Sequence, residues 1–412
     1  MNFTPNSVRA QFPALKQTHN HLPVIFLDGP GGSQVPESVL EAMTSYLGYY
    51  NSNLGGHFFS SRLTTELMQD ARQYAATFVN AESPDNIVFG PNMTSLTFQL
   101  SRAISRDWNS ADEIVVTALD HYSNVSSWQQ AANDKSAKIR VAQVKESDCS
   151  LDVEHLLNLI NTNTKLVAVT LASNTTGSIV DVERIIEAAH DVGAMVYLDA
   201  VHYAPHHLVD VQKLGCDFLV CSAYKFFGPH VGIAYVAPKW LQALRPYKVE
   251  PATEQGPGRF ETGAQSFEGL AGVIAAIKYL AQWGKQDASL REKLVASYLD
   301  FSQHETALTD HFLSKLSELQ GVHLWGRAQA HSELRTPTFA LTFDEYSTAE
   351  IAKRLGERNI CTWNGHFYAL GLVRQLGLEE SGGVLRIGFM HYNTLDEVDT
   401  LFDVMKEILN QK

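Results

Sequence analysis

A carboxylate and an amine stand at the ends of two neighbouring apolar segments of this 412-residue chain. Asp199 ends the segment MVYLD, and Lys225 follows the segment FLVCSAY. Short apolar runs bounded by turn signals are typical of buried strands in a parallel sheet, where ligands bind at the carboxyl ends of the strands. We therefore expect both side chains to project into one crevice. The pair suits pyridoxal phosphate (PLP), because a lysine can hold it as a Schiff base while an acid keeps its pyridine nitrogen protonated.

A cofactor phosphate needs hydrogen-bond donors, which the start of a helix offers. The segment GPNMTS makes a turn and then opens a helix, so the amides of Asn92 and Met93 and the hydroxyl of Thr94 are candidates. Ser222 and Tyr224, on either side of the alanine that ends the predicted strand, can donate to the same phosphate. Taken alone, each of these residues fits an ordinary helix cap or strand end equally well.

Other polar residues follow predicted strands and can complete a site. His121, after EIVVTALD, can stack on the cofactor ring and shuttle protons. Asn174 in LASNTTG and His202 in DAVHYAP can each bond the phenolic oxygen of the ring. Arg386 lies among apolar residues in GGVLRIGF, and its planar fork suits a substrate carboxylate. Turn residues or an internal salt bridge remain alternative interpretations of these positions.

The elements that must position these residues alternate between strand and helix patterns, which predicts an α/β fold with a mainly parallel seven-stranded sheet flanked by helices. We expect strands at 87–90, 113–119, 138–144, 165–173, 194–200, 217–223 and 231–237. We expect helices at 36–50, 61–80, from 92 onward, 125–134 and 181–191.

A Gly/Pro-rich stretch at 254–265 interrupts this alternation. Beyond it the pattern predicts long helices at 267–285 and 288–319, strands at 337–343 and 384–388, and helices at 347–356 and 394–410. We expect a large PLP-binding α/β domain over residues 20–280. Residues 1–19 and 281–412 are expected to form a small α+β domain.

Bulk composition narrows the function classes. The chain is 45% hydrophobic and 19% charged, with a net charge of -13, which is ordinary for a globular protein and disfavours nucleic acid and anionic membrane surfaces as partners. Its four cysteines contain no CxxC pair, so neither a metal site nor a disulfide framework is expected. No apolar run approaches the ~18 residues of a membrane span, and no signal peptide is visible. The cytoplasm is the simplest location.

Several motifs occur in the order seen in one family: FLDGPGGSQVP, GPNMTS, DHYSNVSSW, ASNTTGSIVDV, VYLDAVHYAPH, CDFLVCSAYKFFGPHVGIAYV, RFETGAQ and LRIGFMHYNT. Over residues 24–400 the chain resembles the class V aminotransferases, and within them the cysteine desulfurase and selenocysteine lyase branch. The resemblance implies the PLP fold type I, a homodimer, an active site at the subunit interface and an amino acid as substrate.

Position by position, the resemblance implies that Lys225 carries the cofactor, Asp199 faces the pyridine nitrogen and His121 stacks on the ring. Other positions would hold the cofactor or substrate, and they are Asn174 and His202 beside the ring oxygen, Ser222 and Tyr224 at the phosphate, and Arg386 at the substrate carboxylate. Apart from the resemblance, Asn53 and His57 in the loop 51–60, and Tyr368, are candidates to contact the substrate. Tyr224 replaces a histidine common in desulfurases. Gln265 and Ser266 lie where a neighbouring subunit reaches the phosphate, although Ala264 replaces the family's threonine.

One departure concerns the nucleophilic cysteine of the desulfurases. Tyr368 stands at the cysteine position, Trp363 stands at the position of a preceding arginine, and a phenol cannot accept sulfur as a persulfide. Cys361 lies seven residues earlier and is expected to be a core residue of a strand. The sequence thus predicts a desulfurase-like enzyme that lacks the usual sulfur acceptor.

Two other functions remain open from the sequence. One is true cysteine desulfuration or selenocysteine lysis, using Cys361 or an external thiol. The other is a PLP-binding regulatory protein without turnover, against which the carboxylate-binding arginine argues. A dinucleotide-binding Rossmann enzyme is disfavoured, because no GxGxxG follows the first strand.

Overall fold

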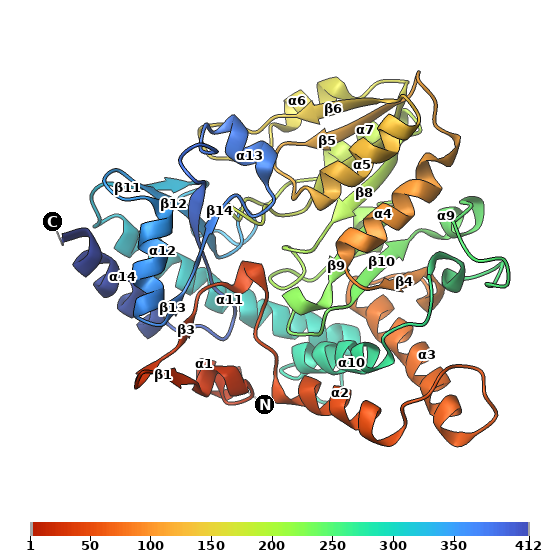
Figure 1. Ribbon diagram of the computed structural model, residues 1–412, viewed down its shortest axis with the longest axis horizontal. Coiled ribbons are helices and arrows are strands. Elements are labelled where there is room, and N and C mark those ends of the chain that lie inside the picture. The colour runs from red at the N-terminus through yellow and green to blue at the C-terminus, as the bar shows by residue number, and fades with distance from the viewer. Residues whose placement is uncertain (1–2, 411–412) are drawn as a thin grey trace.

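The computed structural model describes residues 3–410, and two separate sheets dominate it (Figure 1). The larger sheet has seven strands in the order β4-β10-β9-β8-β7-β5-β6. Its strands are β4 (Ile87–Gly90), β5 (Glu113–Thr117), β6 (Lys138–Ala142), β7 (Thr164–Thr170), β8 (Met195–Asp199), β9 (Phe218–Ser222) and β10 (Gly232–Val236). All neighbours from β9 to β6 are parallel, whereas β10 runs antiparallel to both β9 and β4. The expectation of a mainly parallel seven-stranded sheet is confirmed.

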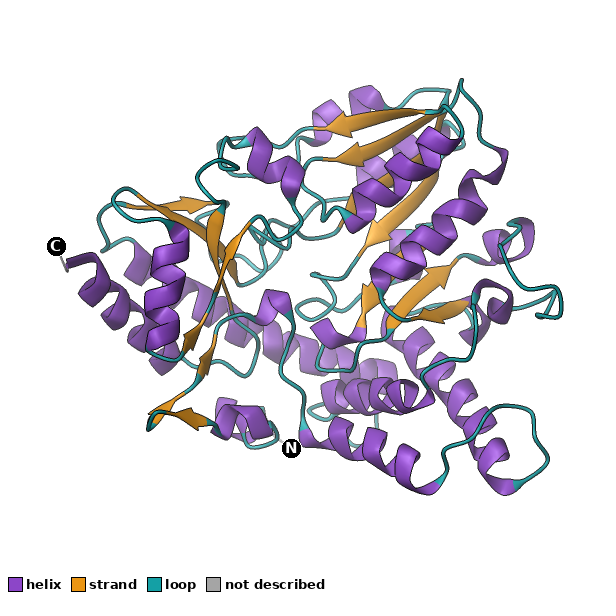
Figure 2. Cartoon of the chain, viewed as in Figure 1, coloured by secondary structure: helices purple, strands orange, loops and turns teal. Residues whose placement is uncertain are grey.

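Helices cover both faces of this sheet (Figure 2). They are α2 (Glu37–Tyr49), α3 (Phe59–Val79), α4 (Met93–Ile104), α5 (Ser123–Asp134), α6 (Val153–Leu159), α7 (Glu183–Asp191), α8 (Val211–Leu214), α9 (Pro238–Ala243) and α10 (Phe267–Ala281). Alternate residues of each strand enter different cores: Leu198 packs on the α3, α7 and α10 side, and Tyr197 packs on the α4 and α5 side. Burial of both faces explains why these strands are apolar throughout rather than alternating.

The smaller sheet lies apart from the larger one and is antiparallel (Figures 1 and 2). Its order is β11-β12-β15-β14, from β11 (Val322–Trp325), β12 (Thr338–Phe343), β15 (Val384–Gly388) and β14 (Trp363–Gly365). Beside it, β3 (Ile25–Phe26) pairs in parallel with β13 (Ile360–Cys361). The helices of this part are α11 (Leu290–Leu316), α12 (Thr348–Glu357), α13 (Leu370–Gln375) and α14 (Leu395–Asn410), and they enclose a separate apolar core.

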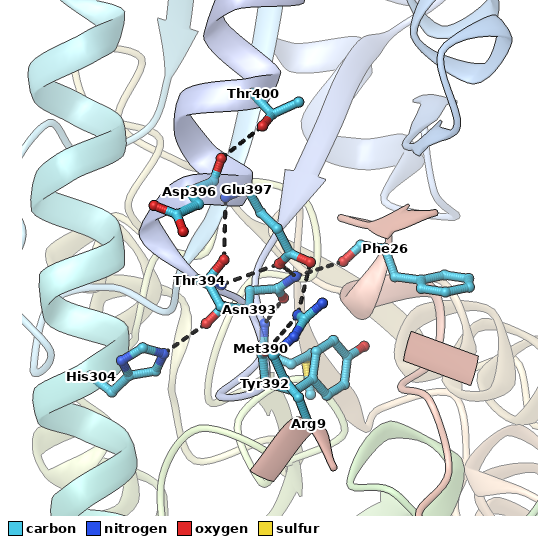
Figure 3. Close-up of polar contacts among 10 residues, drawn as sticks. All are labelled: Arg9, Phe26, His304, Met390, Tyr392, Asn393, Thr394, Asp396, Glu397 and Thr400. Atoms are coloured by element: carbon cyan, nitrogen blue, oxygen red, sulfur yellow. Dashed lines mark hydrogen bonds and ion pairs between the residues drawn. The ribbon is translucent and has the colours of Figure 1, made fainter. Parts of the chain in front are cut away.

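The N-terminal segment is tied to the C-terminal part by a polar cluster (Figure 3). This segment holds α1 (Pro5–Arg9) and the short hairpin β1 (Thr18–His19) and β2 (Leu22–Pro23). Arg9 Nη1 donates to the Tyr392 carbonyl at 2.9 Å and to the Glu397 carboxylate at 2.8 Å. Asn393 Nδ2 donates to the carbonyl of Phe26 and to Glu397. These bonds join β3 and α1 to the start of α14.

Short elements account for most differences from the sequence expectation. The strands β3, β11, β13 and β14 and the helices α6 and α13 contain only two to seven residues, too few to show a clear period. The longer helices and every strand of the large sheet lie within a few residues of the expected ranges. Within residues 3–410, no helix is long and apolar enough to span a membrane.

Candidate active site

A cavity of about 500 Å³ opens where the parallel strands of the large sheet end. The loops and turns after β5, β7, β8 and β9, the start of α4 and the loop before α2 all contribute to its wall. The sequence-predicted residues that line it are Asn92, Met93, Thr94, His121, Asn174, Asp199, His202, Ser222, Tyr224 and Lys225. Side chains that are far apart in the sequence therefore meet at one point.

Asp199 and Lys225 face this cavity from adjacent strands. Asp199 ends β8 and pairs with Val220 of β9, five residues before Lys225. Asp199 Oδ1 accepts a hydrogen bond from the amide of Val201 at 2.8 Å. Burial raises the pKa of Asp199 to about 6, and the opposing effects of that amide and of Lys225 limit the rise. The carboxylate is thus mainly ionised at pH 7.

Lys225 carries an amine whose proton is easily lost. Its Nζ donates to the carbonyls of Pro30 and of Gly31, the latter at 3.0 Å. Burial first, and then the positive charge of Arg386, lower the pKa of Lys225 to about 7, while Asp199 acts against this effect. A large fraction of the amine is therefore neutral and nucleophilic near pH 7.

The start of α4 also provides hydrogen-bond donors to the cavity wall. The Asn92 side chain caps the helix by accepting from the amide of Ser95 at 2.9 Å. The Met93 amide donates to Ser222 Oγ at 2.9 Å, which leaves the serine hydroxyl proton available to a ligand. The first amides of a helix have no acceptor within the helix, and its dipole favours an anion there. This wall has the chemistry of a phosphate site.

His121 is held as a neutral imidazole. The backbone amide of Ser123 donates to His121 Nδ1 at 3.1 Å, which places the ring proton on Nε2. Burial and the positive charges of Lys225 and Arg386 lower the pKa of His121 to about 4. At neutral pH the ring can stack on a planar ligand without adding a positive charge.

Asn174 and His202 leave polar atoms open. Asn174 Nδ2 donates to the carbonyl of Phe367 at 2.9 Å, but its Oδ1 is buried without a hydrogen-bond partner among residues 3–410. His202 Nε2 lies 3.1 Å from Thr336 Oγ1 and 3.0 Å from Thr338 Oγ1, which occupies one ring nitrogen and leaves Nδ1 for a ligand. Burial lowers the pKa of His202 well below its ordinary value, so this ring is also neutral.

Arg386 lies behind the cavity wall rather than in it. It belongs to β15, is only 5% exposed, and its Nη1 donates to the Asn174 carbonyl at 2.9 Å. The ring of Phe367 covers its guanidinium at 3.9 Å. Within residues 3–410 it forms no ion pair, although the charge of Asp28 acts on its pKa. A buried guanidinium without a paired acid is suited to an incoming carboxylate.

Tyr368 and the cysteines occupy different places. The Tyr368 ring packs at a tilt against His121 with centroids 5.3 Å apart, yet 66% of the residue is exposed. None of the four cysteines lines the cavity. Cys361 is half-buried in β13, where burial and Asp28 raise the pKa of its thiol to about 11. Burial raises the pKa of the thiols of Cys149, Cys216 and Cys221 as well.

Several of the predicted residues lie elsewhere. Asn53 and His57 are in the loop between α2 and α3, which Figure 1 shows at the lower right, away from the smaller sheet, and neither lines this cavity. Gln265 lines a separate hollow of about 240 Å³ beside Pro91. Trp363 is in β14, 54% exposed.

Sequence reasoning missed Asp28, His230 and Phe367. His230 lines the cavity and stacks on Tyr224 with centroids 4.8 Å apart. Burial raises the pKa of Asp28, whose Oδ1 has no partner among the described residues. The only signal for Asp28 and His230 is their place in the motifs FLDGPGG and FFGPHVG, where both are typical of turn residues. Phe367 stands beside Tyr368, which the sequence does single out.

The residues present fit pyridoxal phosphate. The cavity holds an amine with a lowered pKa, a buried carboxylate, a neutral imidazole and a set of donors at a helix start. Asn174 Oδ1 is an orphaned buried acceptor in the same wall. An amine, an acid and phosphate donors in one enclosed site are the groups that this cofactor requires.

Comparison with known proteins points the same way. The model of the aminotransferase class-V family matches residues 25–401. A protein of Enterobacter sp. named cysteine desulfurase is 30% identical over 428 residues, which cover 99% of this chain and 99% of that protein. A protein of Gibberella zeae named aminotransferase-like protein FGM3 is 31% identical, with 99% of each chain covered.

A solved structure of cysteine desulfurase from Thermococcus onnurineus, described as apo, superposes on the whole chain with a TM-score of 0.89 and 26% identity, covering 100% of both chains. Some relatives are longer: the chain spans 58% to 65% of the length of three curated proteins named as cysteine desulfurases or probable cysteine desulfurases.

Proposed function

The chain belongs to the class V aminotransferase family, and we propose that it acts on an amino acid without passing sulfur through a cysteine of its own. The relatives of this chain are pyridoxal-phosphate enzymes, and several of them are named cysteine desulfurase. The observation that carries the proposal is the cavity itself: it brings together Lys225, Asp199 and His121, and no thiol is among its lining residues. The ring of Tyr368 contacts His121.

Each residue has a distinct task in this proposal. Lys225 Nζ would hold the cofactor aldehyde and would take and return protons at the substrate α-carbon. Asp199 stabilises the proton on the pyridine nitrogen, His121 stacks on the ring, and Asn174 and His202 position the ring oxygen. When bound, pyridoxal phosphate supplies a ring that accepts negative charge from the substrate α-carbon.

The remaining residues hold the two ends of the ligands. Asn92, Met93, Thr94, Ser222 and Tyr224 bind the phosphate, through the helix start and through hydroxyl groups. Arg386 binds the substrate carboxylate, which fixes the bond to be broken relative to the ring. These tasks are common to transamination, elimination and epimerisation.

The absence of a usable thiol distinguishes this proposal from desulfuration through a persulfide. A sulfur acceptor must be a thiolate within reach of the substrate, because the thiolate is the nucleophile. Cys361 has a raised pKa and contributes to β13 rather than to the cavity. In this proposal Tyr368, whose ring contacts His121 of the cavity wall, takes the position that the resemblance gives to the desulfurase cysteine.

A substrate panel tests the proposal. The holoenzyme is mixed with single amino acids, cysteine included, while the visible absorbance of the cofactor and the products by mass spectrometry are followed. We expect at least one amino acid other than cysteine to change the spectrum and be converted. If no amino acid alters the cofactor, a regulatory role without turnover is the better account.

The names of several relatives favour a second candidate, cysteine desulfuration or selenocysteine lysis. Incubation with L-cysteine and a reductant separates the two. We expect slow or no sulfide release, unchanged in Cys361→Ser. Rapid sulfide release that Cys361→Ser abolishes would overturn the proposal, while release that persists in the variant would indicate an external acceptor.

We also propose a homodimer with the α2–α3 region at its interface. Large apolar side chains are exposed there, and they are Leu40, Leu47, Tyr49, Leu54, Phe58, Phe59 and Leu63. Exposed apolar groups that gather on one region of a protein mark an interaction surface. The same region holds Asn53 and His57, which would then reach the partner's cavity.

A further inference from the structure

The short segment 366–369 between β14 and α13, here called the aromatic cap, contacts His121 and Asn174, two residues that line the cavity. Two adjacent residues in it, Phe367 (φ 50°) and Tyr368 (φ 59°), adopt the left-handed conformation. Residues with a Cβ rarely do so, and a pair in succession must be held by its surroundings. The backbone conformation of the cap therefore fixes the orientation of two aromatic rings, Phe367 and Tyr368.

Hydrogen bonds from the large sheet hold the cap in place. The amide of Tyr122 donates to the Tyr368 carbonyl at 2.7 Å, and Asn174 Nδ2 donates to the Phe367 carbonyl at 2.9 Å. Within the cap, the Tyr368 amide donates to His366 Nδ1 at 3.0 Å. Both anchors outside the cap follow strands whose ends form the cavity wall. The cap is therefore fixed relative to the site.

The two rings of the cap contact two residues that the proposed function assigns to ligand binding, Arg386 and His121. Phe367 lies flat over the Arg386 guanidinium at 3.9 Å, and Tyr368 packs against His121 at 5.3 Å with 31° between the ring planes. Phe367 covers one face of the guanidinium, so a carboxylate must approach in the plane of its N–H groups. Tyr368 remains 66% exposed, so much of its ring is free to contact a further group.

No acidic or basic side chain belongs to the cap apart from His366, which packs edge-on against Tyr368 with centroids 6.0 Å apart. Aromatic pairs gain from offset or edge contacts beyond the area that they bury. A flat apolar group would extend the series of rings from His121 through Tyr368. A small thiol would cover less of the Tyr368 ring, and a charged side chain would find only His366 within the cap.

We infer that the aromatic cap selects an amino acid with an aromatic side chain, which packs against the exposed ring of Tyr368 while Arg386 holds the carboxylate. This inference rests on the proposed function, because it assigns the substrate class of the same site. Tyr368 is a specificity-determining residue here, and Phe367 is a positioning residue that acts through Arg386.

Binding of unreactive carboxylates tests the inference without any turnover. The holoenzyme is titrated calorimetrically with 3-phenylpropanoate and with butanoate, neither of which has an amine to react with the cofactor. We expect 3-phenylpropanoate to bind at least tenfold more tightly. Equal affinities, or no binding of either compound, would overturn the inference.

Three variants locate the effect. Tyr368→Ala should reduce the preference for 3-phenylpropanoate to less than threefold, whereas Tyr368→Phe should keep it, because the ring and not the hydroxyl makes the contact. Tyr247→Ala is the matched control: this tyrosine is 52% exposed and stacks on Arg106, but it does not line the cavity. A preference that survives Tyr368→Ala, or is lost in Tyr247→Ala, would contradict the assignment.

The titration separates this inference from the proposed function. If the tenfold preference and its loss in Tyr368→Ala are observed while no amino acid changes the cofactor spectrum, the cap inference holds and the proposed enzyme activity fails. If amino acids react but aromatic and aliphatic ones do so alike, the activity holds and the cap inference fails.

Discussion

At the scale of single residues, the chemistry depends on how burial acts on a few charges. Lys225, Asp199 and His121 all lose part of their contact with water. Burial lowers the pKa of Lys225 and His121 and raises the pKa of Asp199, and each shift favours the neutral form of the group. The buried charge of Arg386 acts on both Lys225 and His121 in the same direction. The guanidinium of Arg386 thus adds to the larger effect of burial on the pKa of both groups.

The lowered pKa of Lys225, about 7, predicts how the apoprotein captures its cofactor. Only the neutral amine attacks an aldehyde, so the capture rate should rise with pH, reach half its maximum near that pKa, and level off within about two pH units above it. The measurement is the return of visible absorbance after PLP is added to apoprotein over a series of pH values. An ordinary lysine, with a pKa of about 10.4, would still gain rate at the upper end, and that result would contradict the assigned environment.

Sequence reasoning reached these residues because strand ends can be recognised. Asp199, His121 and Asn174 each follow an apolar run, and parallel strands bring their ends to one edge. It did not reach His230 or Asp28, because a turn residue shows no period that tells which way it points. The apolar neighbours of Arg386 made it a candidate. Its position behind Phe367 depends on the left-handed conformation of the cap, which no local sequence pattern predicts.

At the scale of elements, the turn 173–178 after β7 packs against the start of β12 in the smaller sheet. Gly177 has φ of 75°, and its carbonyl accepts from the amide of Thr336 at 2.9 Å. A Cβ on Gly177 would lie 2.8 Å from the Thr338 carbonyl and 2.9 Å from the Thr336 carbonyl. The turn also carries Asn174, so its packing against β12 sets one wall of the cavity.

Gly177→Ala should therefore destabilise the protein by more than the left-handed conformation alone, which costs about 1–2 kcal/mol for an L-residue. Gly193→Ala is a matched control, because Gly193 has φ of 77° and a Cβ added there would meet no atom within 4 Å. Urea unfolding of both variants gives the comparison. Similar losses of free energy in the two would show that the contact with β12 does not constrain the turn.

The element pattern itself was largely predictable. Strands of the large sheet are buried on both faces and form continuous apolar runs, and helices such as α3 and α12 show a clear amphipathic period. The sequence did not reveal β13 and β14 as two separate strands, because strands of two or three residues are too short to show a periodic pattern. The pairing of β13 with β3 also joins distant parts of the sequence, which no local pattern predicts.

At the scale of the whole molecule, the exposed apolar side chains of the α2–α3 region predict self-association. Replacing Phe58 and Phe59 together by serine should shift the protein from dimer to monomer, because the two residues are 60% and 62% exposed and lose their apolar surface. Light scattering after size-exclusion chromatography measures the mass. Val249→Ser, at a position 70% exposed in a different region, should leave the dimer intact. A protein that is monomeric before any substitution would contradict the proposal.

The central claim is that Lys225 Nζ holds the cofactor, and borohydride reduction of the purified protein tests it most directly. Reduction followed by proteolysis and mass spectrometry should find the cofactor mass on Lys225, and the Lys225→Ala protein, folded to the same extent by circular dichroism, should carry none. Cofactor on another lysine, or a reduced protein with Lys225 unmodified, would contradict the account.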